Sequence, residues 1–316
     1  MSDEPRVYVL HENPEWFPPF AAAFAAEGVP VEEWLLTGGS IDLSAEPPRG
    51  VFWSRLSASA HTRDHAASKD YGRAVLRWLE SWGRTVVNGS PVLELEVSKV
   101  AQHAALRRAG IDVPRTIAVF GAADLVARAE ELPAPFITKH NQGGKGLGVR
   151  RFDSHAEFAA WVEGPEFEPS PDGITLLQEY LVAREPFVTR VELVGGAYLY
   201  AVRVDTSAGG FELCPAEACA LPGAAGVEPE PLFRLREGFE QNPLVERYER
   251  FLASIGAEIA GIEFIETADG RVVTYDVNTN TNYSPDVEAA SPVSGPRAIA
   301  RRLGALLGER VLVPSA

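Results

Sequence analysis

The first ninety residues alternate short apolar runs with longer amphipathic stretches. The short runs are four to seven residues long and are bounded by Gly, Pro and polar residues, which predicts strands. The longer stretches end at glycine and carry apolar residues at helical spacing, which predicts helices. Strands that alternate with helices indicate a layered, mostly parallel α/β unit, which ends near Pro91. The predicted strands are 6–10, 31–36, 50–56 and 85–88, and the predicted helices are 19–27 and 71–83.

From Ser98 onward the pattern predicts a mixture of helices and strands. Ser98 can cap the helix "KVAQHAALRRAG", whose last turn is basic and whose end is marked by Gly110. Two pairs of β-prone runs are joined by Gly-Gly and Asp-Gly, dipeptides typical of tight hairpin turns. The predicted strands are 113–120, 134–140, 149–152, 175–181, 185–194, 197–204, 261–267 and 271–278, and the predicted helices are 124–132, 153–164, 243–254 and a C-terminal one.

The hairpin of residues 261–278 places two acidic residues against each other. If its tip is a two-residue turn, Glu263 lies directly opposite Asp276, and Asn278 shares their face. Like charges in that position destabilise a sheet unless a cation lies between them. Mg²⁺ binds a few carboxylates together with water and substrate phosphates, and an asparagine oxygen can join them. The three side chains therefore predict a divalent metal site.

The hairpin of residues 188–204 places two arginines near each other. With Gly-Gly as its turn, Val188 faces Arg203, and Arg190 lies diagonally beside Arg203. Neighbouring arginines on one sheet face are typical of a site for a carboxylate or a phosphate. A solvated face balanced by Glu192 is the alternative that this stretch leaves open.

Lysine is rare in this chain, so its positions carry information. Of 29 basic residues only four are lysine, and two of them, Lys139 and Lys145, border or lie in the Gly-rich loop "NQGGKGLG". The loop lies between two predicted strands, and no Ser or Thr follows Lys145. It is therefore neither a P-loop nor a dinucleotide-binding turn. Backbone N–H groups near Gly144 and Gly146 could instead cover an anion, and a surface hairpin with uninvolved lysines is the alternative.

Composition excludes several classes of protein. The chain has 316 residues, 46% of them hydrophobic and 23% charged, as expected for a globular protein of two or three lobes. Its net charge of −15 argues against a nucleic-acid partner. No signal peptide and no apolar run of membrane-spanning length is recognisable, so no membrane partner is expected. Cys214 and Cys219 are too few for a disulfide framework, which favours a cytoplasmic protein.

Taken in order, these motifs resemble the ATP-grasp superfamily, and most closely the branch of the ribosomal-protein glutamate ligase and glutathione synthase. The resemblance covers about residues 85–290 and rests on "VVNGSPVLELEVSKV", "FITKHNQGGKGLGV", "LLQEYL", "EPFVTRVEL", "AVRVD" and "GIEFIE…YDVN". It implies that two lysines and a flexible flap hold the ATP phosphates, that the "QEYL" backbone meets adenine, and that an acidic residue holds the ribose. The implied nucleotide-binding residues are Lys99, Lys139, Lys145, Gly144, Gly146, Gln178, Glu179, Tyr180, Leu181 and Glu185, and the implied metal ligands are Glu263, Asp276 and Asn278.

The resemblance also implies a fold and an activity. The expected fold class is α/β and α+β: an N-terminal layered α/β pre-ATP-grasp domain (1–91), followed by a two-lobed ATP-grasp fold. Its small lobe (92–182) would carry the flap, and its large lobe (183–316) would carry the metal site. The implied enzyme is a ligase in which ATP, with Mg²⁺ or Mn²⁺, phosphorylates a carboxylate and an amine displaces the phosphate. Arg190 and Arg203 would be the catalytic residues that steady the carboxylate or the acyl phosphate.

The partners of such an enzyme would be small-molecule carboxylate and amine substrates or a peptide, and a homodimer stays open. An ATP-grasp kinase and a nucleotide-binding regulatory protein without ligase chemistry are the alternatives. The chain departs from the family pattern at Val188, where an acidic residue is usual, and after Asn278, where "TNTNYSPD" replaces the usual Pro-Gly. The two metal carboxylates are also exchanged in type. His11 and Trp16 follow the carboxyl end of a predicted strand and are candidates for substrate contact.

Overall fold

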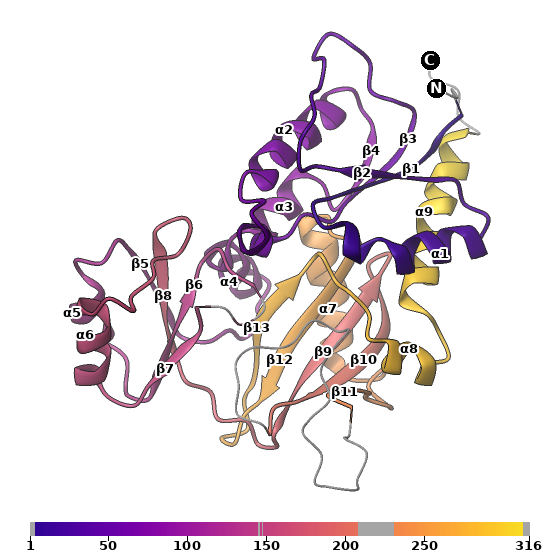
Figure 1. Ribbon diagram of the computed structural model, residues 1–316. Coiled ribbons are helices and arrows are strands. Elements are labelled where there is room, and N and C mark those ends of the chain that lie inside the picture. The colour runs from indigo at the N-terminus through magenta and orange to yellow at the C-terminus, as the bar shows by residue number, and fades with distance from the viewer. Residues whose placement is uncertain (1–3, 145, 147, 208–230, 312–316) are drawn as a thin grey trace, which may run out of the picture.

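The computed structural model describes residues 4–144, 146, 148–207 and 231–311 and folds them around three β-sheets (Figure 1). The first sheet consists of β1 (Arg6–His11), β2 (Val31–Leu35), β3 (Gly50–Ser54) and β4 (Thr85–Val87). Its strands are parallel and lie in the order β2-β1-β3-β4. In β1, Val7 and Val9 are buried on one face and Tyr8 and Leu10 on the other. Burial on both faces is typical of a parallel sheet between helices, as the sequence predicted.

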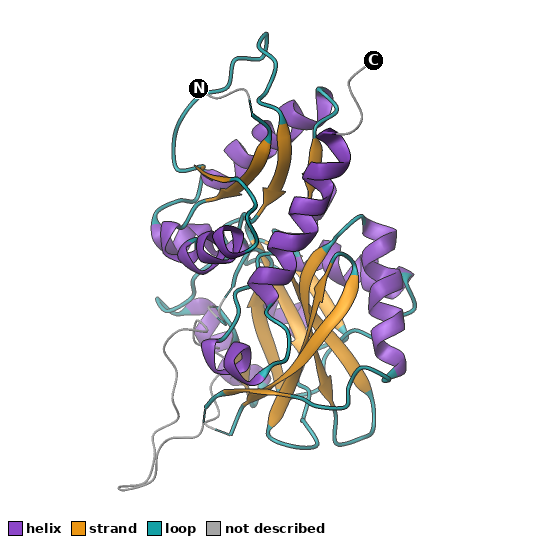
Figure 2. Cartoon of the chain, turned by 90° about the vertical axis from the view of Figure 1, so that its right-hand side faces the viewer, coloured by secondary structure: helices purple, strands orange, loops and turns teal. Residues whose placement is uncertain are grey.

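Helices cover both faces of this first sheet (Figure 2). On one face lie α2 (Ser68–Ser81) and α3 (Ser90–Glu96), and on the other lie α1 (Pro18–Ala26) and the C-terminal helix α9 (Gly295–Val311). Leu303 of α9 packs in one apolar cluster with Phe24 of α1 and with Ile259, which belongs to the third sheet. The C-terminal helix therefore returns to the N-terminal sheet and joins it to the rest of the molecule.

The second sheet is antiparallel, with the strands β5 (Thr116–Phe120), β6 (Phe136–His140), β7 (Arg150–Phe152) and β8 (Ile174–Glu179). Its order is β5-β8-β6-β7. The helices α5 (Leu125–Ala129) and α6 (His155–Glu163) pack on one face, in a core that includes Phe136 and Leu177. Lys139 and Gln178 alternate with these core residues in β6 and β8. Their side chains therefore lie on the face opposite the helices.

The third sheet is antiparallel and is ordered β11-β10-β9-β12-β13. Its strands are β9 (Phe187–Val194), β10 (Ala197–Asp205), β11 (Phe233–Leu235), β12 (Ile259–Glu266) and β13 (Val272–Asn278). Helix α7 (Pro243–Ile255) covers one face, where Tyr248 and Phe251 pack against Ile262 and Phe264. The other face carries Glu263 and its neighbours, and α8 (Pro285–Ala290) packs beside β11 at its margin (Figure 1).

Helix α4 (Lys99–Arg108) packs against β13 and, in Figure 1, lies between the second and third sheets. Two short 3-10 helices, η1 (Pro14–Trp16) and η2 (Ala58–Arg63), follow β1 and β3. The predicted strands and helices are all present, with ends that differ by a few residues. In the part of the chain that the structure describes, no helix is both long and apolar enough to cross a membrane. Cys214 and Cys219 lie outside the described residues.

Candidate active site

Helix α4 presents three polar side chains to strand β13. Lys99, Gln102 and His103 have the i, i+3, i+4 spacing that puts side chains on one helix face. The Gln102 side chain donates a hydrogen bond to the Val277 carbonyl at 2.9 Å and accepts one from the Val277 N–H at 3.1 Å. Because β13 is an edge strand, this side chain satisfies backbone groups that have no neighbouring strand. The pairing also fixes the position of the strand so that Lys99 meets Asp276.

His103 lies on the same face of α4 and remains neutral. Its side chain is buried, and burial together with the charges of Lys139 and Lys99 lowers its pKa to about 4. A neutral imidazole therefore lies near the two lysines and adds no third positive charge.

The turn of the β12–β13 hairpin differs from the predicted one. Thr267, not Ala268, faces Arg271, because the Thr267 N–H donates to the Arg271 carbonyl at 2.9 Å. The loop therefore has three residues and ends at Gly270, whose φ of +87° suits glycine. The two-residue turn predicted from the sequence is wrong, and by itself this error would misalign the two carboxylates.

A β-bulge restores the alignment of the carboxylates. Phe264 pairs with Thr274, whereas the preceding residue of β12, Glu263, pairs with Asp276. Tyr275 is thus an extra residue in β13, and it lies on the same face as Asp276 because its hydroxyl donates to Glu263 Oε2 at 2.7 Å. Bulges re-aim side chains in this way and are frequent beside active sites. The predicted opposition of Glu263 and Asp276 is confirmed.

Positive charge surrounds both carboxylates. Asp276 forms an ion pair with Lys99, and Glu263 accepts a hydrogen bond from Arg190 Nη1 at 3.2 Å. Burial raises the pKa of Glu263, despite the opposing charge of Arg190. Burial would also raise the pKa of Asp276, but the charges of Lys99 and Lys139 outweigh it and hold that pKa below its ordinary value. The two carboxylates thus differ in how readily they bind a proton, and Asp276 is the more firmly ionised.

Arg190 uses its whole guanidinium group on three partners. Its Nε donates to Glu192 at 2.6 Å, its Nη1 to Glu263, and its Nη2 to Thr281 Oγ1 at 2.5 Å. The guanidinium lies over Gly261, where an added Cβ would come within 2.6 Å of Nε. Glycine at that position therefore makes room for the arginine. Burial opposes the charge of Arg190, but its two carboxylate partners raise its pKa above the ordinary value.

The prediction that Arg203 lies beside Arg190 is wrong. The Gly-Gly turn is as expected, but a second bulge, at Leu199 in β10, shifts the register by one residue. Arg203 therefore pairs with Thr189, one position away from Arg190, and points to the opposite face of the sheet. There its guanidinium stacks over the Phe187 ring, 3.9 Å from the ring centroid.

The Gly-rich loop is anchored at its first residue. Asn141 Oδ1 accepts hydrogen bonds from the Val100 N–H at 2.9 Å and from Ser98 Oγ at 3.2 Å, at the N-terminus of α4. Its amide nitrogen donates to Asp172 at 2.6 Å. Ser98 also caps α4, as predicted, by accepting from the Ala101 N–H. The base of the loop and the helix that carries Lys99 therefore form one hydrogen-bonded unit.

Beyond this anchor the loop reaches the N-terminal unit. Gly144 approaches η2 so closely that an added Cβ would lie 2.9 Å from the Cβ of Ser59. Gly146 has a φ of +75°, which favours glycine. Both glycines line the cavity that contains Lys99. Lys145, the predicted cation at the tip, lies outside the described residues.

Lys139 and Gln178 face the region between the second and third sheets. Lys139 Nζ lies 5.2 Å from the centroid of the Tyr275 ring, which connects it to the bulged strand. Burial lowers the pKa of Lys139, because the charged ammonium form loses contact with water. Gln178 is buried, and its Oε1 accepts no hydrogen bond from any residue that the structure describes.

The other predicted nucleotide-binding residues continue from β8. The Glu179 carboxylate accepts two hydrogen bonds from Arg271, at 3.0 and 3.2 Å, and so connects β8 to the tip of the β12–β13 hairpin. Tyr180 and Leu181 are half-buried, and Glu185 is exposed. This segment crosses from the second sheet to the third.

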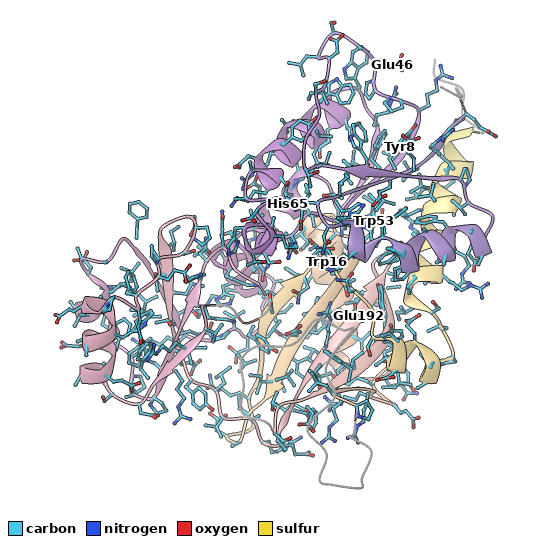
Figure 3. The ribbon with its side chains drawn as sticks, viewed as in Figure 1. Tyr8, Trp16, Glu46, Trp53, His65 and Glu192 are labelled. Carbon is cyan, nitrogen blue, oxygen red and sulfur yellow. The ribbon has the colours of Figure 1, made fainter. Side chains whose placement is uncertain are left out.

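A cavity of about 180 Å³ lies against the open face of the third sheet. It is lined by Lys99, by the side chains around Asp276, and by Trp16 and Ser59 of the N-terminal unit. Figure 3 shows Trp16 and Glu192 close together where the first and third sheets meet, and both line the cavity. His11, the other N-terminal candidate, is fully buried and bonds instead to the Asn13 carbonyl at 2.9 Å.

Three buried polar residues that the sequence analysis did not single out connect the first sheet and its helix α3 to the third sheet and the loop after it. Glu96 accepts hydrogen bonds from the N–H and the hydroxyl of Thr279, both at 2.8 Å. Arg55 donates to the Thr281 carbonyl at 3.0 Å, and Asn88 donates to a carbonyl of β12 at 2.7 Å. Burial raises the pKa of Glu96. A signal for Glu96 exists in the sequence, since it is a charged residue in the otherwise apolar run "PVLELEV".

The side-chain oxygens on this face that could act as metal ligands fit a magnesium ion. Among residues 4–144, 146, 148–207 and 231–311, the structure gathers no three His, Cys, Asp or Glu side chains that could hold a metal. Glu263, Asp276 and Asn278 bring two carboxylates and one amide together, with the Asn278 amide 3.3 Å from Glu263 Oε1. Two carboxylates and a neutral oxygen suit Mg²⁺, which takes its other ligands from water and phosphates.

Comparison with known proteins finds similar sequences and similar structures. No family model matches the chain. It is 28% identical over 233 residues to a "Probable alpha-L-glutamate ligase" of Xanthomonas axonopodis pv. citri, covering 71% of this chain and 69% of that protein. The structure is similar to that of the ATP-grasp ligase PsnB complexed with a minimal precursor, with a TM-score of 0.67, 17% identity, and coverage of 96% of this chain and 99% of that one.

The same ligase in complex with minimal precursor, Mg and ADP gives a TM-score of 0.65 at 17% identity, over 95% of this chain and 96% of that chain. A D-alanine–D-alanine ligase from Bacillus anthracis complexed with ATP gives a TM-score of 0.66 at 14% identity, over 98% of both chains. At these identities the structural neighbours show the fold, which they share over nearly the whole chain.

Proposed function

We propose that this chain, which has the ATP-grasp fold, is an ATP-dependent carboxylate–amine ligase that forms an amide bond and releases ADP and phosphate. The observation that carries the proposal is the face of the third sheet on which Glu263, Asp276 and Arg190 meet Lys99 in one cavity. Two acids held beside two cations suit the transfer of a phosphoryl group, because that reaction needs its charge neutralised in a fixed arrangement. The name of the bacterial relative supports the same class of reaction.

The nucleotide would lie between the second and third sheets. Lys99 and Lys139 would hold its phosphates, and the backbone N–H groups near Gly144 and Gly146 would cover them. The adenine would lie against the backbone that runs from Gln178 to Leu181, with Glu185 near the ribose. Lys145 would add a cation from the tip of the flap. The shared face of Lys139 and Gln178 supports this placement.

Mg²⁺ or Mn²⁺ would be held by Glu263, Asp276 and Asn278. When bound, the ion supplies positive charge to the phosphates during transfer. Lys99 forms an ion pair with Asp276. If a metal cation bound the Asp276 carboxylate instead, Lys99 would be free to contact a phosphate. Tyr275 and Arg190 hold Glu263 in place from two sides.

The chemistry divides into two steps. An oxygen of the substrate carboxylate attacks the γ-phosphorus, the bond to the β-phosphate oxygen breaks, and ADP leaves. The amine nitrogen then attacks the acyl carbon, inorganic phosphate leaves with the electrons of the carbon–oxygen bond, and the amine loses a proton. Arg190 lies in the cavity where the acyl phosphate would form, and its charge suits both the carboxylate and the phosphate.

The substrates are an amino-acid-like acid and an amine, either free or as part of a peptide. One structural neighbour, PsnB, is a ligase complexed with a precursor peptide, and another is named as a D-alanine–D-alanine ligase, so proteins with this fold act on both kinds of substrate. The position of the cavity between the N-terminal unit and the third sheet, with Trp16 and Ser59 at its margin, suits a substrate that enters past the first sheet.

The destination of the γ-phosphate tests the proposed reaction. With γ-labelled ATP, Mg²⁺ and a mixture of L-amino acids and dipeptides, we expect the label in inorganic phosphate and, in equal amount, a product lighter by one water than its two precursors. Mass spectrometry measures both. A kinase would leave the label on an organic product, and that outcome would exclude the ligase. Lys99→Ala is the matched negative control.

Binding of nucleotide is expected to protect the Gly-rich loop from hydrogen exchange. The amides of Gly143, Gly144 and Gly146 should exchange rapidly in the free protein and at least about 10-fold more slowly with an ATP analogue and Mg²⁺, because local opening sets exchange and bound phosphates suppress opening. Amides of α7, buried on the far face of the third sheet, are the internal control. Equal exchange of the loop with and without nucleotide would contradict its role as a phosphate cover.

A further inference from the structure

The bulge at Leu199 has a second consequence for the cavity. It turns Tyr200, Val202 and Val204 to the same face as Arg190, because Glu192 pairs with Tyr200 and Arg190 pairs with Val202. Without the bulge these three side chains would lie on the α7 side of the sheet. All three line the cavity.

Two further elements complete an apolar wall. Phe233 of β11 pairs beside Val204, and Val287 projects from α8 at the margin of the sheet. Both line the cavity and belong to one apolar cluster with Val202 and Tyr200. The "apolar wall" therefore consists of Tyr200, Val202, Val204, Phe233 and Val287. It is continuous with the charged part of the cavity, since the pairs Glu192–Tyr200 and Arg190–Val202 lie across neighbouring strands.

The charges beside the wall do not suit an acidic group. Among the described residues that line the cavity, four are acidic and only two, Lys99 and Arg190, are cationic. Each of these cations is already paired with a carboxylate. The Tyr200 hydroxyl donates to Glu288 at 2.7 Å, which places a further carboxylate near the wall. A second carboxylate on a substrate would meet repulsion and lose water without gaining a cation.

We propose that the apolar wall receives the apolar side chain of the substrate, so that the enzyme acts on a leucine-, valine- or phenylalanine-like compound and not on glutamate. This inference rests on the proposed ligase function and names the substrate class of the same site. The wall adjoins Arg190 and the two metal-site carboxylates, so its occupant belongs to the reacting molecule. Such an apolar side chain is carried either by a free amino acid or by one residue of a peptide.

A substrate panel tests the inference on the unmodified protein. Leucine, valine, phenylalanine, glutamate, aspartate and lysine are supplied with ATP and Mg²⁺, each as the free amino acid, as its N-acetyl form, as its amide and at the end of a dipeptide. The blocked forms separate the acid from the amine substrate, and the dipeptides separate free amino acids from peptides. We expect kcat/KM for leucine or phenylalanine to exceed that for glutamate by at least about 10-fold. The glutamate carboxylate would lose its water at the wall without gaining a cation, a larger penalty than the roughly 10-fold that a hydrophobic pocket gains per methylene.

A pair of variants tests whether the apolar wall is the source of the preference for apolar substrates. Val202→Ala removes two methyl groups from the wall, and Val191→Ala removes the same two from the buried α7 side of the neighbouring strand. We expect Val202→Ala to lower kcat/KM for leucine by about 10-fold relative to alanine, whereas Val191→Ala keeps that ratio and lowers only the thermal midpoint. Phe233→Ala, at a half-buried position, repeats the test if Val202→Ala does not fold.

The outcomes separate this inference from the proposed function. Amide formation with glutamate preferred over leucine would overturn the apolar wall as a substrate site and leave the ligase intact. Equal loss of the leucine-to-alanine ratio in Val202→Ala and Val191→Ala would also overturn it. Nucleotide binding without any conjugate from the whole panel would remove the proposed function and the inference together.

Discussion

Replacing Asp276 with asparagine is expected to lower the turnover of ATP by at least about 100-fold, the size of effect seen when one group that helps to stabilise transition-state charge is lost. The substitution keeps the shape of the side chain but removes the negative charge that pairs with Lys99 and faces Glu263. Binding of the metal weakens, and Lys99 loses the partner that positions it. A coupled enzymatic assay of ADP release, run over a range of Mg²⁺ concentrations, measures the loss of turnover.

The same substitution should also destabilise the protein, whether or not metal is present. From the sequence alone, two opposed carboxylates suggest that removing one relieves repulsion. The structure reverses this expectation, because Lys99 and Lys139 both contribute to holding Asp276 ionised. Removing the charge leaves a buried lysine without its ion-pair partner, a change that costs about 1–3 kcal/mol of the free energy of unfolding. Urea unfolding with EDTA measures this value.

Asp269→Asn is the matched control for this prediction. It makes the same chemical change in the same hairpin, but at the exposed tip, where Asp269 bonds to Thr267 and Arg271 of the turn. Turnover should stay within about 2-fold of the parent, as is usual for a surface substitution of small energetic effect. An Asp276→Asn protein that is more stable than the parent without metal would show that the pairing with Lys99 is not the dominant interaction.

The sequence predicts the elements of this fold well because local patterns determine them. The alternation of short apolar runs and helices in the first ninety residues gives the parallel sheet, and the Ser98 cap gives the start of α4. The capping residue also helps to place Lys99 at the first turn of that helix. These features depend on neighbours within a few residues, so a single sequence contains them.

Register is harder to predict, because a single unpaired residue reverses the face of all that follow. In the β12–β13 hairpin the predicted turn is wrong by one residue, and the bulge at Tyr275 cancels that error. In the β9–β10 hairpin the predicted turn is right, but the bulge at Leu199 places Arg203 on the face opposite Arg190. Neither bulge has a glycine or proline to mark it. The predicted register is therefore right for the carboxylate pair and wrong for the arginine pair, although both hairpins carry a recognisable turn dipeptide.

Contacts between distant segments could not be predicted either. Glu96, Arg55 and Asn88 bind backbone groups of the third sheet or of the loop after it, and the partners are more than 150 residues away in the sequence, as in the 171-residue separation of Asn88 and Ile259. Each satisfies a buried polar group, which is a three-dimensional requirement with no local pattern. These three residues also hold the first sheet against the third, so that residues from both parts line one cavity.

Replacing Arg190 with lysine is expected to lower turnover by about 100-fold or more, while the affinity for ATP changes much less. The guanidinium reaches Glu192, Glu263 and Thr281 with three different nitrogens. A lysine ammonium is a single point and cannot hold these partners in one plane, although it keeps the charge. The loss should therefore appear in kcat, because Glu263 is no longer held in a fixed position beside the reacting groups. Steady-state kinetics and binding of an ATP analogue separate the two quantities.

Arg203→Lys provides the matched comparison, because it makes the same change one strand away. Arg203 stacks on Phe187 on the opposite face of the sheet and lies outside the cavity. Turnover should remain within about 3-fold of the parent, since a partly exposed cation–π contact contributes only about 0.5–1 kcal/mol. The sequence predicts that both arginines act on the substrate, and the structure predicts that only Arg190 does. A large loss of kcat in Arg203→Lys with a folded protein would mean that the register of β9 and β10 is that of an unbulged hairpin, and it would remove the apolar wall along with it.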